Sequence, residues 1–291
     1  MSFFKPTLGP IVIAGALLAG CGSDDLPDYF LLDRLRVVAA SISGAAAEFS
    51  AGDAGISVVF HVSDPKGAGR TLTYSFEACV DPGVGLGATP NCTGNPTRTV
   101  LTANAATTLA ADYYGTIATP AFAIPAAALV FANPATGALR PAYEQANGVG
   151  YLVVMNLSAG SEAISAFKRV VVSTKTTKNQ NPAFASPALL FGGVDAATYA
   201  LTTSPFTIVA SAAVGSAETY LIENSDGTTD TKGEKLTATY LITDGEIHDT
   251  RGDPGASNSY SPSNPLPATS GFIVVLRDER GGVAVTAIQK P

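Results

Sequence analysis

The side chains that most often carry catalysis are few in this 291-residue chain, which has three cysteines and two histidines. His61 lies in the apolar stretch Ile56-Ser57-Val58-Val59-Phe60-His61-Val62, and His248 lies in Glu246-Ile247-His248-Asp249. Neither belongs to a His-x-x-x-His or His-Glu-x-x-His pattern, and the sequence has no Gly-x-Ser-x-Gly elbow or phosphate loop. We therefore expect both histidines to have structural roles, hydrogen-bonded or facing solvent, and we predict no catalytic residues and no cofactor.

Acidic residues are the more plentiful candidates for chemistry. Glycoside hydrolysis needs two carboxyl groups about 5 to 9 Å apart across a cleft, and Glu234, Asp244 and Asp278 are the acids that could supply such a pair. Oxygen ligands for Ca²⁺ could come from six aspartates, namely Asp226, Asp230, Asp244, Asp249, Asp253 and Asp278. The stretch from Asp226 to Gly233 lacks the spacing and the final Glu of an EF-hand, and Asp favours turns for backbone reasons. We expect turn-forming acids and no metal site.

The N-terminal residues resemble a bacterial lipoprotein signal. Lys5 precedes an apolar run over residues 11–20, which is too short for a membrane-spanning helix of about 20 residues. The run ends in Leu18-Ala19-Gly20-Cys21. The resemblance implies cleavage before Cys21, attachment of lipid to its sulfur, and sorting to the outer membrane, because Gly and not Asp follows the cysteine. The alternative is an ordinary signal peptide in which Cys21 is coincidental.

Cys79 and Cys92 are the cysteines that remain once Cys21 carries lipid. Outside the inner membrane the compartment is oxidising, so we expect a disulfide between them. The residues that separate them are rich in Gly and Pro and predict a loop. Closing that loop would stabilise the fold by roughly 3 kcal/mol in the chain-entropy model. Two free thiols are the alternative, and a metal site is disfavoured because two cysteines without a nearby histidine are too few ligands.

The charge balance excludes one class of partner. The formal net charge is −7, and the acids are scattered along the chain. Nucleic acid binding needs clustered Lys and Arg, so we expect no nucleic acid partner. The same balance argues against a polybasic membrane patch, which leaves the lipid at Cys21 as the expected contact with the membrane.

Period-2 alternation makes β-strands the dominant expected element. In residues 72–79, Leu72, Tyr74 and Phe76 share one face and Thr73 and Ser75 share the other, as one face of a sandwich requires. Further strands are expected near residue 35 and at 56–62, 150–157, 164–173, 219–222, 236–240, 271–276 and 283–288. Residues 100–146 contain four spaced prolines and predict loops with short strands.

The second half of the chain repeats the first. Leu236 to Tyr240 matches Leu72 to Phe76, and Gly271 to Leu276 matches Gly150 to Met155. The spacing is too irregular for a solenoid, so we predict two diverged copies of one sandwich. The predicted division is a signal peptide at 1–20, a lipid-anchored tether at 21–31, a first sandwich at 32–176, a linker at 177–204 and a second sandwich at 205–291.

The stretches Leu236 to Gly245 and Phe272 to Gly282 resemble PKD-like and related immunoglobulin-like domains. Those domains carry an aromatic strand that ends near Asp-Gly, followed by an apolar strand that ends in Asp-x-x-Gly-Gly. The arrangement also resembles two-module lipoproteins of predatory and soil bacteria. The resemblance implies an all-β fold of two tandem immunoglobulin-like sandwiches that act as binding modules or spacers, and such a fold alone fixes no function.

These observations favour a lipid-anchored envelope protein with a non-catalytic binding, adhesion or spacer role, whose partner is a protein or glycan. The alternative function is a hydrolase of envelope glycans that uses paired carboxylates. The second sandwich is expected at the end remote from the anchor, with its loops as the contact surface. One of these loops, residues 249–265, contains the adhesive tripeptide Arg251-Gly252-Asp253, although such tripeptides recur by chance.

Overall fold

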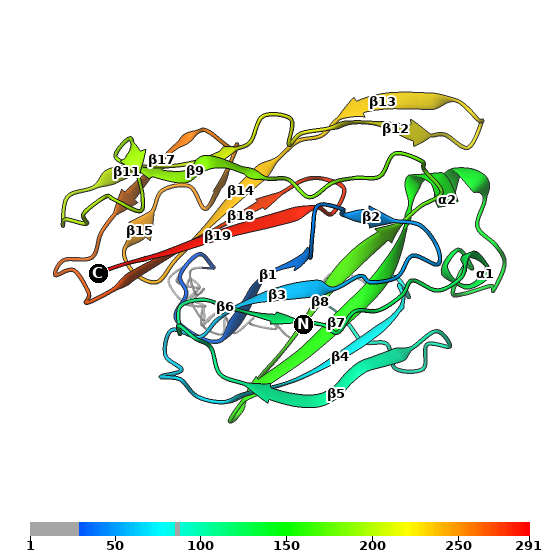
Figure 1. Ribbon diagram of the computed structural model, residues 1–291, viewed down its shortest axis with the longest axis horizontal. Helices are drawn as coiled ribbons and strands as arrows, with labels where there is room; N and C mark the ends of the chain where they lie inside the picture. Colours follow the sequence, from blue (N-terminus) through cyan, green and yellow to red (C-terminus); the bar gives the residue numbers. More distant parts are fainter. Residues whose placement is uncertain (1–28, 85–87) are drawn as a thin grey trace, which may run out of the picture.

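The fold is that of an all-β protein, described by a computed structural model for residues 29–84 and 88–291 (Figure 1). The predicted signal peptide and Cys21 lie outside the described residues. The described part of the chain forms four larger sheets and one separate hairpin, together with two short helices, α1 (Ala127–Val130) and α2 (Ala142–Asn147). The prediction of an all-β sandwich fold is therefore confirmed.

The first sandwich consists of a three-stranded and a five-stranded sheet. The smaller sheet has the order β1 (Arg36–Ile42), β3 (Val58–Ser63), β6 (Gly115–Ala118). The larger has the order β2 (Glu48–Phe49), β8 (Glu162–Val172), β7 (Val149–Ala159), β4 (Leu72–Val80), β5 (Thr99–Thr107). Alternate residues of the central strands, such as Phe60, Phe76 and Met155, are fully buried between the two sheets.

The second sandwich packs an aromatic core between its two sheets. One has the order β10 (Val194–Asp195), β9 (Phe184–Phe191), β11 (Phe206–Ala212), β17 (Ser257–Ser261), β15 (Glu246–Ile247). The other has the order β16 (Arg251–Gly252), β14 (Thr237–Ile242), β18 (Ser270–Arg277), β19 (Val283–Lys290). The Phe272 ring lies 4.8 Å from that of Phe191 and 5.0 Å from that of Tyr260. The separate hairpin joins β12 (Thr219–Glu223) to β13 (Thr229–Gly233).

A third apolar cluster joins the two sandwiches. Leu241, Ile273 and Val275 project from the outer face of β14 and β18 and pack with Ala39 of β1 and with Leu32. The sheets therefore stack as four layers, with β14, β18 and β19 between the other sheet of the second sandwich and the first sandwich (Figure 1). Burial on both faces explains why residues 272–276 form a continuous apolar run and do not alternate.

The first described residues attach to the second sandwich. The backbone N–H of Leu32 donates to the carbonyl of Ile242 at 2.7 Å, and the N–H of Ile242 donates to the carbonyl of Phe30 at 3.0 Å. The expectation that the second sandwich lies remote from the tether is therefore wrong, because the chain enters the fold at strand β14. Leu32, predicted as the start of the first sandwich, packs in the cluster between the two.

The internal repeat has a structural counterpart, and two predicted loops are strands. The matched segments are neighbouring strands in both halves, since β4 pairs with β7 and β14 pairs with β18. The predicted linker, residues 177–204, instead contains β9 and β10, because Leu189 and Phe191 fill the second core. The predicted loop 249–265 contains β16 and β17, anchored by the buried ring of Tyr260.

Candidate functional site

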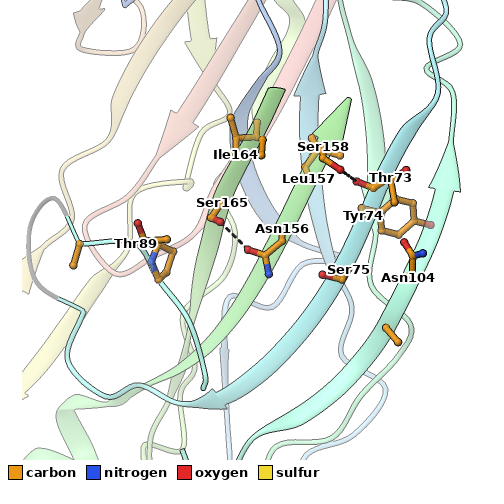
Figure 2. Close-up of a pocket in the computed structure, with 14 residues that line it drawn as sticks. Thr73, Tyr74, Ser75, Thr89, Asn104, Asn156, Leu157, Ser158, Ile164 and Ser165 are labelled. Atoms are coloured by element: carbon orange, nitrogen blue, oxygen red, sulfur yellow. Dashed lines mark hydrogen bonds between the residues drawn. The ribbon is translucent and has the colours of Figure 1, made fainter. Parts of the chain in front are cut away.

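The outer face of the five-stranded sheet changes character along its strands. Towards one end of the strands it is apolar, with Leu152 and Val154 of β7 fully buried. Towards the other end it carries short polar side chains. Ser75 pairs with Asn156, and Asn156 pairs with Ser165 on the next strand. Asn104 lies opposite, in the stretch where the register between β4 and β5 shifts. Asn104, Ser75, Asn156 and Ser165 thus form a row across four strands, here called the polar row (Figure 2).

The disulfide loop covers the apolar end of this face. Cys79 and Cys92 are bonded with their Cα atoms 5.8 Å apart, which confirms the predicted pair. Both are fully buried and pack on Leu152 and Val154. The carboxylate of Glu77 accepts a hydrogen bond from the backbone N–H of Cys92 at 2.9 Å and another from the Nε of Arg98 at 2.7 Å. The loop is thereby fixed to the sheet at several points.

A groove of about 590 Å³ lies over the polar row, with the disulfide loop as one wall. The wall is formed by Ala88 to Pro90, and Figure 2 shows Thr89 facing the row across the groove. The described residues that line the groove are all uncharged: Thr73, Tyr74, Ser75, Ala88, Thr89, Pro90, Ala103, Asn104, Asn156, Leu157, Ser158, Ala163, Ile164 and Ser165. The groove therefore offers hydroxyl and amide groups on a rigid sheet, without ionic groups.

Most hydrogen-bonding capacity of the polar row is directed to the groove. The hydroxyl of Ser165 donates to the Oδ1 of Asn156 at 2.7 Å, which fixes the orientation of that amide. Within the described residues, the Nδ2 of Asn156, the amide of Asn104 and the hydroxyl of Ser75 have no hydrogen-bond partner. A ligand in the groove would therefore meet both donors and acceptors.

The acids proposed for hydrolysis lie elsewhere and are engaged in structural hydrogen bonds. Asp278 accepts from the backbone N–H groups of Arg280 and Gly282 at 2.8 and 2.7 Å. Asp244 accepts from the hydroxyl of Tyr260 at 3.1 Å. The side chain of Glu234 is fully buried, and burial above all raises the pKa of its carboxyl group. None of the three lines the groove.

Arg280, in the β18–β19 turn, links three carboxylates at the joint between the sandwiches. Its guanidinium lies 2.5 Å from Glu48 of the first sandwich, 3.3 Å from Glu234 and 3.5 Å from Glu218. It also stacks on the ring of Tyr220, 4.7 Å from the centroid. Only 12% of the Arg280 side chain is exposed, so this cluster is a largely buried connection.

His61 is a buried structural residue, in agreement with its expected role. It lies on the face of β3 directed to the second sandwich, where its Nε2 is 2.8 Å from the hydroxyl of Ser41 and its Nδ1 is 2.7 Å from that of Tyr114. Burial lowers the pKa of the imidazole to about 4. His248, by contrast, lies on the surface, 3.2 Å from Asp249.

The low pKa of His61 predicts an acid-sensitive fold. The unfolded chain binds a proton near pH 6.5 and the folded chain only near pH 4, so stability falls as pH drops through this window. Acidification through this window should lower the free energy of unfolding by up to about 3 kcal/mol. Urea titrations at pH 7 and pH 4.5 should show a larger loss in the wild type than in His61→Gln, which cannot titrate. An equal loss in both proteins would contradict this prediction, and so would a His61 imidazole that titrates near pH 6.5 by NMR.

The proposed calcium ligand Asp226 and the start of the adhesive tripeptide make contacts that belong to the fold. Asp226 accepts from the backbone N–H and the hydroxyl of Thr228 at 2.9 and 2.7 Å, as a turn-forming acid does. Arg251 and Gly252 pair with β14, so the adhesive tripeptide begins in a strand. In the described ranges, no group of three or more His, Cys, Asp or Glu residues is arranged to hold a metal ion. Nor does any described helix have the length and apolarity to cross a membrane.

The groove residues were not identified from the sequence. Alternation does place Thr73 and Ser75 on the outer face of their strand. Asn156 lies in the predicted strand 150–157 and in β7, but its neighbours in sequence do not indicate that it meets Ser75 and Ser165. The available signal is the recurrence of short polar residues at alternate positions in 73–75 and 156–158, with Ser165 on the next strand. Only the register between strands shows that they meet.

Comparisons with known proteins give no family. A scan against protein-family models and a search of curated proteins both found no match. Solved structures similar to the chain include a red sea bream transglutaminase, with 14% identity over 88% of this chain and 31% of that one and a TM-score of 0.27. The Pseudomonas aeruginosa CupB2 chaperone is 9% identical over 86% of this chain and 100% of its own, with a TM-score of 0.25. The Bacillus subtilis sporulation control protein Spo0M is 10% identical over 86% of this chain and 89% of its own, with a TM-score of 0.25. The chain spans under a third of the transglutaminase, and scores this low carry no argument about function.

Proposed function

We propose that this protein is a lipid-anchored binding module of the bacterial cell envelope, which holds its partner in the groove without chemical change. The observation that carries the proposal is the groove itself: an uncharged row of amides and hydroxyls on a rigid sheet, walled by a disulfide-bonded loop. Binding sites typically combine a fixed scaffold with a few convergent polar groups. We further propose that both sandwiches belong to the immunoglobulin-like, PKD-like class.

The anchor is the part of the proposal that rests on sequence alone. Leu18-Ala19-Gly20-Cys21 supports lipid attachment at Cys21, and more than one acyl chain on a residue would hold the protein stably at the outer membrane. Cells fed radiolabelled palmitate should label the protein, and Cys21→Ala should abolish the label. Label retained in that variant would exclude Cys21 as the attachment site.

The groove can be tested without the anchor. Protein without residues 1–21, which carries neither the apolar run 11–20 nor the anchor cysteine, should co-sediment with isolated envelopes through the groove alone. Asn156→Asp keeps the size of the side chain and removes the Nδ2 donor, so retention should fall about fivefold, the effect of one lost hydrogen bond. Because Asn156 is exposed, stability should change by less than about 0.5 kcal/mol.

Asn264→Asp supplies the matched control, since Asn264 is an exposed asparagine between β17 and β18, outside the groove. It should leave retention unchanged. If Asn156→Asp and Asn264→Asp reduce retention equally, or neither does, the groove is not the binding site and the proposed function fails.

A further inference from the structure

We infer that the groove takes a linear, uncharged oligosaccharide, laid across the strands along the polar row. This inference rests on the proposed function and narrows its partner to one chemical class. Four independent features of the groove support it: its lack of charge, its hydrogen-bonding groups, their spacing, and the contrast with the equivalent face of the second sandwich.

The lining excludes strongly charged ligands. None of the fourteen described lining residues is ionised, although the chain as a whole carries Lys, Arg, Asp and Glu in quantity. A phosphate, carboxylate or ammonium group bound here would lose water without gaining a counter-charge, which is costly. A ligand whose polar groups are neutral hydroxyls and amides meets no such penalty.

The polar row matches sugar hydroxyls in hydrogen-bonding type. A sugar hydroxyl both donates and accepts, and an asparagine amide offers two donors and an acceptor in one plane. The Asn156 amide is held by Ser165, with its Nδ2 directed away from that bond, and Asn104 presents a second amide at the opposite end of the row (Figure 2). Between them Ser75 adds a hydroxyl.

The spacing of the row fits a repeating polymer. Neighbouring strands lie about 4.8 Å apart, so one polar group recurs at each interstrand step and the row from Asn104 to Ser165 spans roughly 14 Å. Each step is close to the length of one hexose unit in an extended chain. A linear oligosaccharide that crosses the strands would therefore offer one sugar to each strand. Ala88 to Pro90 would flank it on the side of the disulfide loop.

A comparison with the second sandwich shows which part of this face is open. The equivalent face of the second sandwich carries Leu241, Ile273 and Val275, and it is covered by the first sandwich. In the first sandwich the repeat matches Ile273 and Val275 to Leu152 and Val154, which are buried beneath the disulfide loop, and the part of the face that carries the half-buried Ser75 and the exposed Asn156 stays open. Its polarity opposes the stacking of another sheet and leaves the face to a hydrated ligand. Because no carboxyl group lines it, the ligand would be held without the pair of acids that hydrolysis needs.

Isothermal titration calorimetry of the full-length protein in detergent tests the inference. The probes are oligomers of about five units: neutral glucose and N-acetylglucosamine oligomers, uronic acid oligomers, and an uncharged extended peptide. At least one neutral oligosaccharide should bind about tenfold more tightly than the acidic oligomers, because only the latter must desolvate charge. Asn156→Asp and Asn104→Asp should each weaken it about fivefold, and Asn264→Asp should not.

The outcomes separate the inference from the function on which it rests. Tighter binding of the peptide or an acidic oligomer, or no binding of any neutral oligosaccharide at millimolar concentration, overturns the glycan assignment. If Asn156→Asp still reduces retention on envelopes in that case, the groove remains a binding site for another class of partner. If it does not, both the assignment and the proposed function fail.

Discussion

Replacing Arg280 with alanine is expected to lower the free energy of unfolding by about 3 to 5 kcal/mol, the cost of removing one partner from a buried ion pair. Glu48 and Glu234 would keep their buried positions and lose their cation, since their side chains are 2% and 0% exposed. The stacking of the guanidinium on Tyr220 would be lost as well. Urea unfolding monitored by far-UV circular dichroism at pH 7 measures the effect.

Two further variants show whether the loss of stability comes from buried carboxylates that lack a cation. Glu48→Gln in the Arg280→Ala background removes one uncompensated carboxylate and should recover part of the stability, a coupling that a double-mutant cycle measures. Arg34→Ala breaks an exposed pair, 3.6 Å from Asp33, and should cost less than about 1 kcal/mol. If Arg280→Ala is as mild as Arg34→Ala, the cluster does not hold the sandwiches together.

Removal of the disulfide is expected to destabilise the first sandwich by about 3 kcal/mol and to weaken binding in the groove. The bridge closes a loop of sequence separation 13, for which the chain-entropy model gives that value. The double variant Cys79→Ala/Cys92→Ala also frees the wall at Ala88 to Pro90, so retention on envelopes should fall together with stability. Urea unfolding and co-sedimentation measure the two effects.

Reductant provides the control for this pair. It should destabilise the Cys21→Ala protein, in which Cys79 and Cys92 are the remaining cysteines, and leave the double variant unchanged. A double variant that keeps both full stability and full retention would show that the sheet contacts of Glu77 and Asn95 alone hold the loop in place.

The sequence predicts the sheets better than their contacts with one another. Alternation at Leu72, Tyr74 and Phe76 correctly assigns the buried face of β4, because burial of every second side chain is a local property. The segments matched by the repeat are neighbouring strands in both halves, although the repeat alone predicts no pairing. The disulfide between Cys79 and Cys92, expected because they are the two cysteines left for an oxidising compartment, is correctly predicted.

Contacts between distant parts of the chain cannot be predicted from the local pattern of the sequence. The pair of Glu48 and Arg280 is separated by 232 positions, and nothing near either residue indicates the other. The polar row depends on register, which one sequence does not give. The strand β9 was assigned to a linker because its neighbours are polar, whereas Leu189 and Phe191 gain their stability from packing against β11 and β18.

The attachment of Leu32 to Ile242 has a consequence for the order of folding. A chain that emerges amino terminus first presents β1 long before β14 and β18, and the contact between Val38 and Arg277 spans 239 positions. Contacts of such separation form late and slow the search for the native state. The outer face of β1 therefore stays exposed to water until β14 and β18 have been synthesised. Strands made more than 200 residues later complete the burial of β1, so this step of folding takes place beside Leu32, where the described chain joins β14.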